Sequence, residues 1–152
     1  MPFRTAFPLL VLLACSPAVE PNNTDTTPAD SEAENDADVA TDACEGVTPE
    51  VTDLGLADLD TMLENKDFEL INVHIPYAGE IVGTDVNIPY NTVDDIETYL
   101  GGDHAAKAVL YCLTGPMSAA ATAELVKRGY CQIYDLPDGL YQWEAAGYPT
   151  TD

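Results

Sequence analysis

One stretch of the chain places a strand, a cysteine and a helix directly after one another. The run Ala108–Tyr111 is apolar and β-prone, and it ends at Cys112. Gly115 and Pro116 indicate a short turn, and the alanine-rich segment 117–128 that follows predicts a helix. This succession narrows the folds open to the chain, because a strand followed at once by a helix is the repeating unit of a parallel sheet covered by helices.

The same alternation of strand and helix extends over the chain from residue 51 onward. About 100 residues suit a single small domain with one core. The alternation predicts an α/β fold with a parallel sheet, and functional sites in such sheets lie at the carboxyl ends of the strands. Strands are predicted at 51–54, 68–74, 86–89, 108–111 and 132–136, and helices at 56–64, 92–100, 117–128 and 139–146.

Cys112 is the candidate nucleophile. Unpaired backbone N–H groups and the positive end of a helix dipole both favour thiolate, which is the nucleophilic form of cysteine. The alternative is a small buried hydrophobic residue, which is the commonest role of a free cysteine. The local pattern favours neither interpretation over the other.

The first residues have the composition of a targeting signal. A short basic start precedes an apolar run of about ten residues, which is too short to span a bilayer. Residues 12–15, Leu-Leu-Ala-Cys, resemble the bacterial lipobox, which is cut before a cysteine that is then acylated. We expect a signal peptide at 1–14 and lipidation at Cys15, with an ordinary secretory signal as the alternative. The resemblance implies a protein of the bacterial cell envelope, periplasmic or surface-facing, attached to the membrane only through its lipid.

Residues 15–50 have the composition of a tether. They are rich in Asp, Glu, Thr, Ala, Asn and Pro, they contain no aromatic residue, and they have no helical or strand period. Such a segment cannot bury enough apolar surface to offset the entropy lost on ordering. We therefore expect an acidic, disordered spacer before a folded domain at 51–152; a metal-buffering or partner-binding role is the alternative.

The charge of the chain excludes one class of partner. Lys and Arg total 5 against 27 Asp and Glu, a formal net charge of -22. Eight of the acids lie between residues 20 and 42, so the predicted domain is strongly acidic as well. Nucleic acid is excluded because binding it needs clustered cations, and the overall field disfavours dianionic substrates. The cations of the predicted domain are Lys66, Lys107, Lys127 and Arg128.

Several motifs of the predicted domain resemble those of rhodanese-like domains, in the same order. Residues 70–74, Leu-Ile-Asn-Val-His, resemble the family's LIDVR, and residues 79–89 resemble its GHIPGA…NIP. Residues 111–118, Tyr-Cys-Leu-Thr-Gly-Pro-Met-Ser, resemble its active loop, YCxxGxRS. Further on, Gly129-Tyr130, Asp138-Gly139, Trp143 and Ala146-Gly147-Tyr148-Pro149 resemble GY…GG…W…AGxP.

The resemblance implies a single rhodanese-like domain, with a five-stranded parallel sheet flanked by helices. It also implies that Cys112 carries sulfane sulfur as a persulfide between a small sulfur-containing donor and an acceptor, without a cofactor. Asn72 and His74, at the end of another strand, are candidate supporting residues. Cys and His are too scattered for a metal site. The amides expected around the sulfur belong to Leu113, Thr114, Gly115, Met117 and Ser118, and we expect the Ser118 side chain to cap the helix rather than bond the sulfur.

The active loop departs from the family pattern in its charge. Met117 stands where the family usually has arginine, and no cation lies between residues 113 and 117. Thiosulfate is a dianion, so the loss of charge-assisted donors weakens its case as the sulfur donor. Pro116 removes one amide from the loop, and Asn72 and His74 replace a charged Asp and Arg of the family.

Two alternatives to sulfur transfer follow from these departures. One is a non-catalytic rhodanese-like module for protein interaction or thiol-redox sensing, which the missing arginine favours and the retained Cys112 opposes. The other is a cysteine-based phosphatase, a chemistry that requires an arginine in the turn to bind the phosphate oxygens. No arginine lies there, which argues strongly against a phosphatase.

The other two cysteines of the chain are candidates for a disulfide. If the sheet order of the rhodanese-like family applies, the strands that follow Cys44 and Cys131 are neighbours, and both thiols lie at the amino edge of the sheet. Cys112 lies at the opposite edge. A Cys44–Cys131 bridge would leave Cys112 as the free thiol, and two unpaired thiols are the alternative.

Overall fold

The computed structural model describes residues 44–151. The signal peptide predicted at 1–14, the lipidation site Cys15 and most of the tether predicted at 15–50 lie outside the described residues. Among the helices of residues 44–151, none combines the length and the apolar character needed to cross a membrane.

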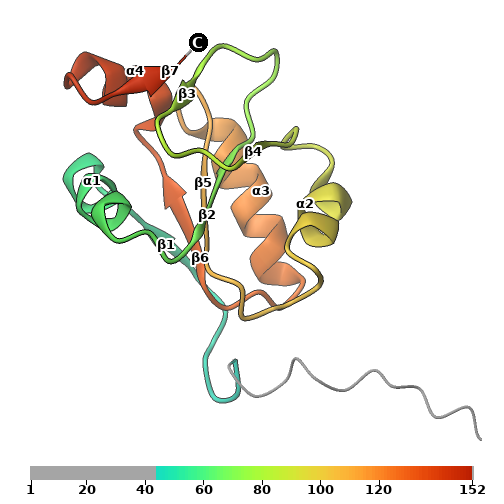
Figure 1. The fold of residues 1–152 in the computed structure, drawn as a ribbon. Helices are drawn as coiled ribbons and strands as arrows, with labels where there is room; N and C mark the ends of the chain where they lie inside the picture. The colour runs from blue at the N-terminus through green and yellow to red at the C-terminus, as the bar shows by residue number, and fades with distance from the viewer. Residues whose placement is uncertain (1–43, 152) are drawn as a thin grey trace, which may run out of the picture. The chain divides into compact units, whose positions relative to one another are not determined.

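Five parallel strands form the central sheet, as predicted (Figure 1). Their order is β1-β6-β5-β2-β4, so β5 lies in the middle with β6 and β2 on either side. In the register of the sheet, Leu110 of β5 lies beside Ile71 of β2 and Asp135 of β6. The strands are β1 (Val51–Asp53), β2 (Glu69–Asn72), β4 (Val86–Asn87), β5 (Ala108–Tyr111) and β6 (Ile133–Leu136).

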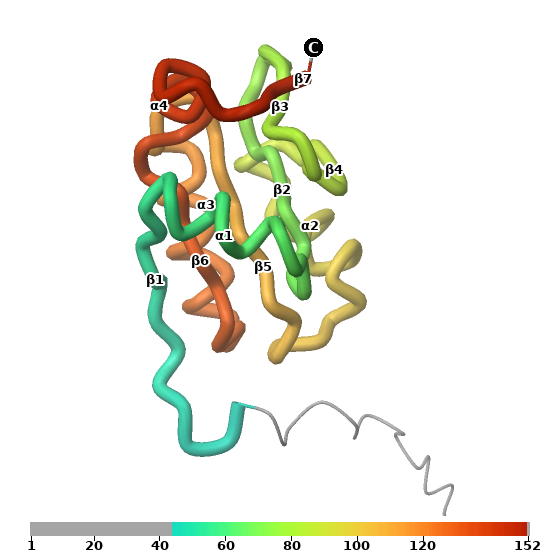
Figure 2. Tube along the Cα trace, turned by 60° about the vertical axis from the view of Figure 1, so that its left-hand side comes forward, coloured from blue at the N-terminus to red at the C-terminus, as the bar shows by residue number. Residues whose placement is uncertain are grey.

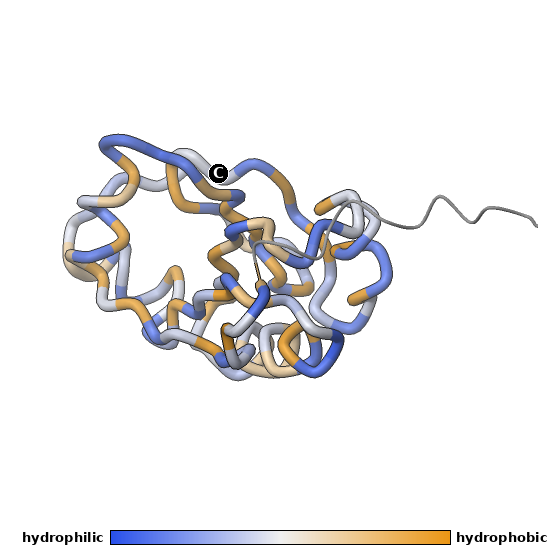
Figure 3. The backbone as a smooth tube through the Cα atoms, turned by 90° about the horizontal axis from the view of Figure 1, so that it is seen from below, coloured by the Kyte–Doolittle hydropathy of each residue, from blue (hydrophilic) through white to orange (hydrophobic). Residues whose placement is uncertain are grey.

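Four helices cover the two faces of the sheet, which completes the predicted α/β fold. Helices α2 (Val93–Tyr99) and α3 (Pro116–Lys127) lie on one face, and α1 (Leu56–Glu64) and α4 (Gly139–Ala145) on the other (Figures 1 and 2). Hydrophobic and hydrophilic residues alternate along the helices (Figure 3), because each helix buries only the stripe that faces the sheet.

Strand β5 contributes to both halves of the hydrophobic core. Ala108 and Leu110 pack on the side of α2 and α3, whereas Val109 and Tyr111 pack on the side of α1 and α4. All four side chains are fully buried. A strand covered on both faces needs an unbroken apolar run, which explains the sequence that precedes Cys112.

Two short strands were not predicted, and β2 and β4 are both shorter than the strands predicted at 68–74 and 86–89. Strands β3 (Glu80–Ile81) and β7 (Thr150–Thr151) form a separate antiparallel pair. Strand β2 ends at Asn72 instead of residue 74, because the Asn72 Oδ1 atom accepts the His74 amide hydrogen at 3.0 Å. That side-chain bond takes the amide away from further strand pairing.

A disulfide joins Cys44 to Cys131, with Cα atoms 5.8 Å apart. Cys131 precedes β6, and β6 pairs with β1, so the bridge lies at the amino edge of the sheet. It spans 87 residues, and in the chain-entropy model closing so long a loop contributes about 4–5 kcal/mol to stability. Cys112 is the free cysteine among residues 44–151.

Candidate active site

Cys112 lies where β5 ends at the carboxyl edge of the sheet. Its side chain is 2% exposed, and it packs against the core on the α2 and α3 side. Helix α3 begins at Pro116, one residue earlier than predicted, and Gly115 is its N-cap. Pro is well suited to the first position of a helix, because the N–H that it lacks would have no partner in the helix there. Strand, cysteine and helix are thus joined by a three-residue turn.

Gly115 shapes this turn and supplies the donor to the sulfur. Its N–H donates a hydrogen bond to the Cys112 Sγ atom over 3.0 Å. Its φ angle is 99°, and a Cβ atom placed on it would lie 2.3 Å from the Pro137 carbonyl oxygen. Only glycine meets both conditions. Of the five amides expected around the sulfur, Gly115 makes this bond, whereas those of Leu113, Thr114, Met117 and Ser118 make none to it.

Helix α4 binds the backbone of the turn through two of its amides. The amides of Leu140 and Tyr141 each donate a hydrogen bond of 2.9 Å, to the carbonyl oxygens of Cys112 and Leu113 respectively. Gly139 allows this approach, because a Cβ atom on it would lie 2.7 Å from the Cys112 carbonyl oxygen. The Asp138-Gly139 pair belongs to a motif that resembles the family pattern, but the sequence did not predict that Gly139 would contact the backbone of the cysteine turn.

Ser118 does not cap α3, so that expectation is wrong. Its hydroxyl donates to the Gly115 carbonyl oxygen over 2.9 Å and lies 3.9 Å from the Cys112 Sγ atom. The reason is position: with the helix starting at Pro116, Ser118 is inside the first turn and faces the sheet, fully buried. The hydroxyl is thus one of the polar groups nearest to the sulfur.

Asp135 is a buried carboxyl group that the sequence analysis missed. It lies on β6, is 3% exposed, and its Oδ1 atom has no hydrogen-bond partner. Burial raises the pKa of Asp135 to about 6; the Ser118 hydroxyl opposes that rise, and the carboxylate of Asp53 adds to it. An acid within the predicted strand 132–136 departs from the apolar pattern of buried parallel strands, but only the register with β5 and β1 shows that it is buried.

The two candidate supporting residues hold a neighbouring segment rather than the sulfur. The side-chain amide of Asn72 donates to the Gly79 carbonyl oxygen over 3.0 Å, and its oxygen accepts the His74 amide hydrogen. The His74 Nδ1 atom is buried and has no hydrogen-bond partner. Neither side chain is bonded to Cys112, so the structure brings them to the same edge of the sheet without joining them to the thiol.

Tyr111 ties the same neighbouring segment to β5. Its hydroxyl oxygen accepts the Ile81 amide hydrogen over 3.0 Å and lies 2.7 Å from the Thr84 hydroxyl. Burial raises the pKa of Tyr111 to about 12, so its hydroxyl stays protonated at neutral pH. The residue directly before Cys112 therefore fixes the segment around β3.

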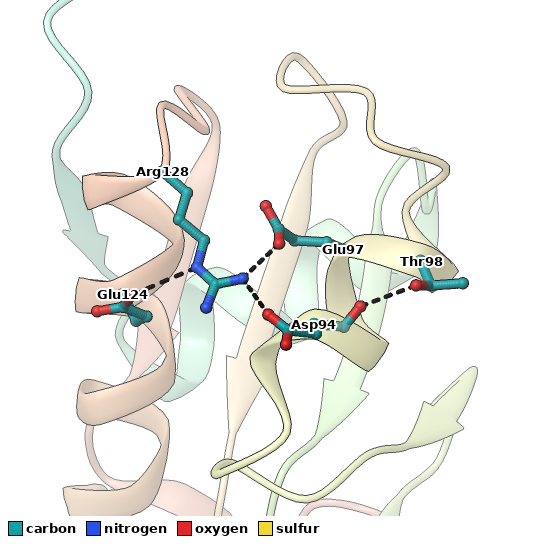
Figure 4. A network of polar contacts seen from close by, with 5 residues as sticks. All are labelled: Asp94, Glu97, Thr98, Glu124 and Arg128. Carbon is teal, nitrogen blue, oxygen red and sulfur yellow. Dashed lines mark hydrogen bonds and ion pairs between the residues drawn. The ribbon is translucent and has the colours of Figure 1, made fainter.

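The cations of the described domain lie away from Cys112. Arg128, at the C-terminal end of α3, bonds Asp94 at 2.6 Å and also Glu97 on α2, and Glu124 at 3.3 Å on its own helix (Figure 4). These acids hold the pKa of Arg128 above its usual value. Cys112 is at the opposite end of this helix, which twelve residues make about 18 Å long.

The three lysines are similarly engaged. Lys107, just before β5, pairs with Asp67 at 2.8 Å, and Lys127 pairs with Glu124 at 3.5 Å. Lys66, just before β2, pairs with Asp85. Since Cys112 follows the far end of β5, none of these pairs lies at its end of the strand. Within residues 44–151, no group of three or more His, Cys, Asp and Glu side chains is arranged to hold a metal ion.

The close approach of α4 makes Gly139 a sensitive position. We expect Gly139→Ala to lower the free energy of unfolding by about 3 kcal/mol or more, because positive φ and overlap with two carbonyl oxygens both oppose a side chain. Gly102→Ala is the matched control, since Gly102 has a similar φ of 70° and nothing within 4 Å of its added Cβ. In denaturant unfolding, the control should lose only about 1–2 kcal/mol of the free energy of unfolding. Equal losses in the two variants would contradict the close contact between Gly139 and the cysteine turn.

The buried carboxyl group at position 135 predicts a dependence of stability on pH. A folded-state pKa of about 6, against 3.8 for an ordinary Asp, means that the folded protein holds an extra proton between these values. Wild-type stability is therefore penalised as the pH rises through this range. The stability of Asp135→Asn relative to wild type should increase by about 3 kcal/mol from acidic to neutral pH, measured by denaturant unfolding. A difference that does not change with pH would contradict the burial of this charge.

Comparisons with known proteins agree with this architecture. The model of the rhodanese-like domain family matches residues 56–146. A rhodanese-related protein from Thermoplasma volcanium is 26% identical with a TM-score of 0.56, and the match covers 66% of this chain and 97% of that one. The rhodanese-like domain of an Anabaena sp. protein is 22% identical with a TM-score of 0.53, and the match covers 67% of this chain and 77% of that one.

A third structure shares the fold alone. It is a protein of unknown function from Rhodopseudomonas palustris, described as a "possible tyrosine phosphatase", 19% identical with a TM-score of 0.54, covering 70% of this chain and 86% of that one. No curated protein sequence matches the chain significantly. The family model spans more than half of the chain, and the five-stranded parallel sheet agrees with it: the chain belongs to the rhodanese-like domain family.

Proposed function

We propose that Cys112 handles sulfane sulfur as a persulfide, in a protein anchored to the bacterial cell envelope. The observation that carries the proposal is the position of the thiol, at the end of the central strand, before a helix, with the Gly115 N–H donating to its sulfur. A donor aimed at sulfur stabilises negative charge there, both on the attacking thiolate and on the persulfide that results.

The proposed reaction has two steps at one sulfur atom. The Cys112 thiolate attacks the outer sulfur of a donor R–S–SH, the bond between the two donor sulfurs breaks, and the thiolate RS⁻ leaves. An acceptor nucleophile then attacks the outer sulfur of the Cys112 persulfide and releases the Cys112 thiolate. No electron is gained or lost overall, so the cycle needs no redox cofactor.

The charges around the turn favour a small donor of low charge over thiosulfate. A dianion is bound best by charge-assisted donors, and Arg128 and the lysines of the described domain are paired with acids away from Cys112. Helix α3 has a methionine at position 117, just after the turn, and Asp138 follows Pro137, whose carbonyl oxygen approaches Gly115 of the turn. A low-molecular-weight persulfide fits these surroundings better.

The envelope location is supported by the sequence of the first residues. An apolar run followed by Leu-Leu-Ala and Cys15 is suited to cleavage and acylation, and two or more acyl chains give stable anchoring where one does not. The acidic composition of residues 15–50 suits a spacer that holds the domain away from an anionic lipid surface.

A second function is favoured by the burial of the thiol. Cys112 is 2% exposed, and a sulfur so covered would also suit a rhodanese-like module that binds a protein partner without turnover. The two functions differ in whether sulfur passes through Cys112 to an acceptor.

Cyanide-dependent formation of thiocyanate separates these functions. We expect the full-length protein to turn over a low-molecular-weight persulfide faster than thiosulfate, and Cys112→Ser to give only the uncatalysed background. We also expect Met117→Arg to raise kcat/KM for thiosulfate by about tenfold or more, because a charge-assisted hydrogen bond contributes about 1.5–3 kcal/mol.

Met117→Leu is the matched control, since it keeps the apolar character of the position without adding charge. Its kcat/KM for thiosulfate should equal that of the wild type. An absence of Cys112-dependent turnover with both donors would contradict the enzymatic proposal and leave the non-catalytic module.

A further inference from the structure

Two exposed tyrosines lie on the segments that surround the cysteine turn. Tyr141 on α4 is 59% exposed and Tyr77 is 50% exposed, the highest values among the large hydrophobic side chains of residues 44–151. The amide of Tyr141 donates to the Leu113 carbonyl oxygen, so its residue is in direct contact with the turn that holds Cys112. A tyrosine ring with its face in water is a typical anchor for a protein partner, because one side chain offers both apolar area and a polar end.

A small hollow joins the segment of Tyr77 to helix α4. Residues 78–80 line one side, Leu140 and Glu144 of α4 line the other, and β7 supplies residues 150–151. Both views of the backbone show α4 and the β3–β7 pair at the same end of the domain (Figures 1 and 2). The hollow has a volume of about 30 Å³, which is room for a water-sized group such as a lysine ammonium and is about a tenth of a small-molecule pocket.

The charges at this end of the domain have one sign. Glu80 and Glu144 line the hollow, and Asp138 is exposed at the N-cap of α4, three residues before Tyr141. None of these three acids takes part in an ion pair within the described part of the chain. The lysines and Arg128 are paired with acids away from the cysteine turn. The complementary surface on a partner is therefore cationic.

We propose that this end of the domain is a docking surface for a lysine-rich segment of a partner protein. The surface, which we call the α4 surface, consists of Tyr77, Glu80, Asp138, Tyr141 and Glu144. Its carboxylates attract ammonium groups, the tyrosine rings bind cations through their faces, and the hollow accepts one ammonium between Glu80 and Glu144.

Other occupants fit the α4 surface less well. A small organic ligand needs a pocket of several hundred Å³, and the exposed rings of Tyr77 and Tyr141 suit a larger, flatter partner. A metal ion is disfavoured because no group of three or more metal-ligating side chains occurs within residues 44–151. A protein segment with several lysines uses the rings, the carboxylates and the hollow together.

A partner on the α4 surface would be next to the cysteine turn. The amides of Leu140 and Tyr141 contact the carbonyl oxygens of Cys112 and Leu113. The net charge of -22 on the whole chain favours fast encounter with a cationic partner. The inference goes beyond the proposed function, because docking takes place whether sulfur passes to the partner or the domain only binds it.

The experiment maps which carboxylates of the full-length protein a hexalysine peptide reaches. A carbodiimide joins the peptide amines to neighbouring carboxylates, and mass spectrometry of the digested protein gives the yield at each acid. A parallel sample with glycinamide, a single small amine, gives the intrinsic reactivity of each acid. We expect the ratio of hexalysine yield to glycinamide yield to be about threefold higher at Glu80 and Glu144 than at Glu45 and Glu50, two exposed acids before β1.

Two substitutions at one position test the part played by the tyrosine ring. Tyr141→Ala should lower the ratio at Glu144 by about two- to fivefold, because it removes the ring that binds the cation. It keeps the backbone amide that bonds Leu113, and the side chain it removes is mostly exposed, so the turn is not disturbed. Tyr141→Phe is the matched control: it keeps the ring and should keep the wild-type ratio.

Equal ratios at the four glutamates would overturn the inference, because the peptide would then follow net charge alone. Enrichment confined to the acids between residues 20 and 42 would overturn it as well, and so would a ratio at Glu144 that Tyr141→Ala leaves unchanged. None of these measurements involves sulfur. Failure of the proposed enzymatic function is seen separately, in thiocyanate formation.

Discussion

The two hydrogen bonds from α4 to the carbonyl oxygens of Cys112 and Leu113 are the contacts on which the site depends. They require the backbone of Gly139 to touch the backbone of the cysteine turn, and Gly115 of the turn touches the Pro137 carbonyl oxygen, two residues earlier in the same segment. The turn is therefore held by backbone contacts with residues 137–141. A thiol held in this way keeps its position relative to the Gly115 amide, and preorganised donors of this kind stabilise developing charge without moving.

The electrostatics of the domain divide along the length of the sheet. At the amino edge, Lys66, Lys107 and Arg128 are bound to acids, and Arg128 links α2 to α3. At the carboxyl edge, the cysteine turn has backbone donors and a buried carboxyl group but no cation of its own. The proposed preference for a donor of low charge rests on this difference, because a dianion is bound best by charge-assisted donors.

The sequence was sufficient to predict the order of the main strands and helices, and the position of Cys112 on a turn before a helix. Those features follow from local patterns: the apolar run of β5, the Gly-Pro turn, and helices at the expected spacing. The expected capping role of Ser118 was wrong because Gly115 is the N-cap of α3, and Ser118 lies in the first turn with its hydroxyl bonded to the Gly115 carbonyl oxygen. Asn72 was a candidate supporting residue for the site, and in the structure its side-chain amide bonds Gly79 and His74.

Asp135 and the β3–β7 pair could not be predicted for a different reason. Each depends on pairing between distant segments: Asp135 lies beside Asp53 and Leu110 in the sheet, and Glu80 pairs with Thr151 across about 70 residues of chain. Two-residue strands have no period to detect. An acid in a strand signals burial only once the register with its neighbours is known. The part of the site that distinguishes this chain from the pattern of its family therefore needed the three-dimensional arrangement.

The role proposed for Cys112 is tested most directly by locating the transferred sulfur. Full-length protein is exposed to a low-molecular-weight persulfide or to thiosulfate, alkylated, digested without reductant and analysed by mass spectrometry. We expect one added sulfur atom on the peptide that contains Cys112, at high occupancy with the persulfide and at low occupancy with thiosulfate. A Cys112 peptide without added sulfur under both conditions, in protein that remains folded, would contradict the proposed role.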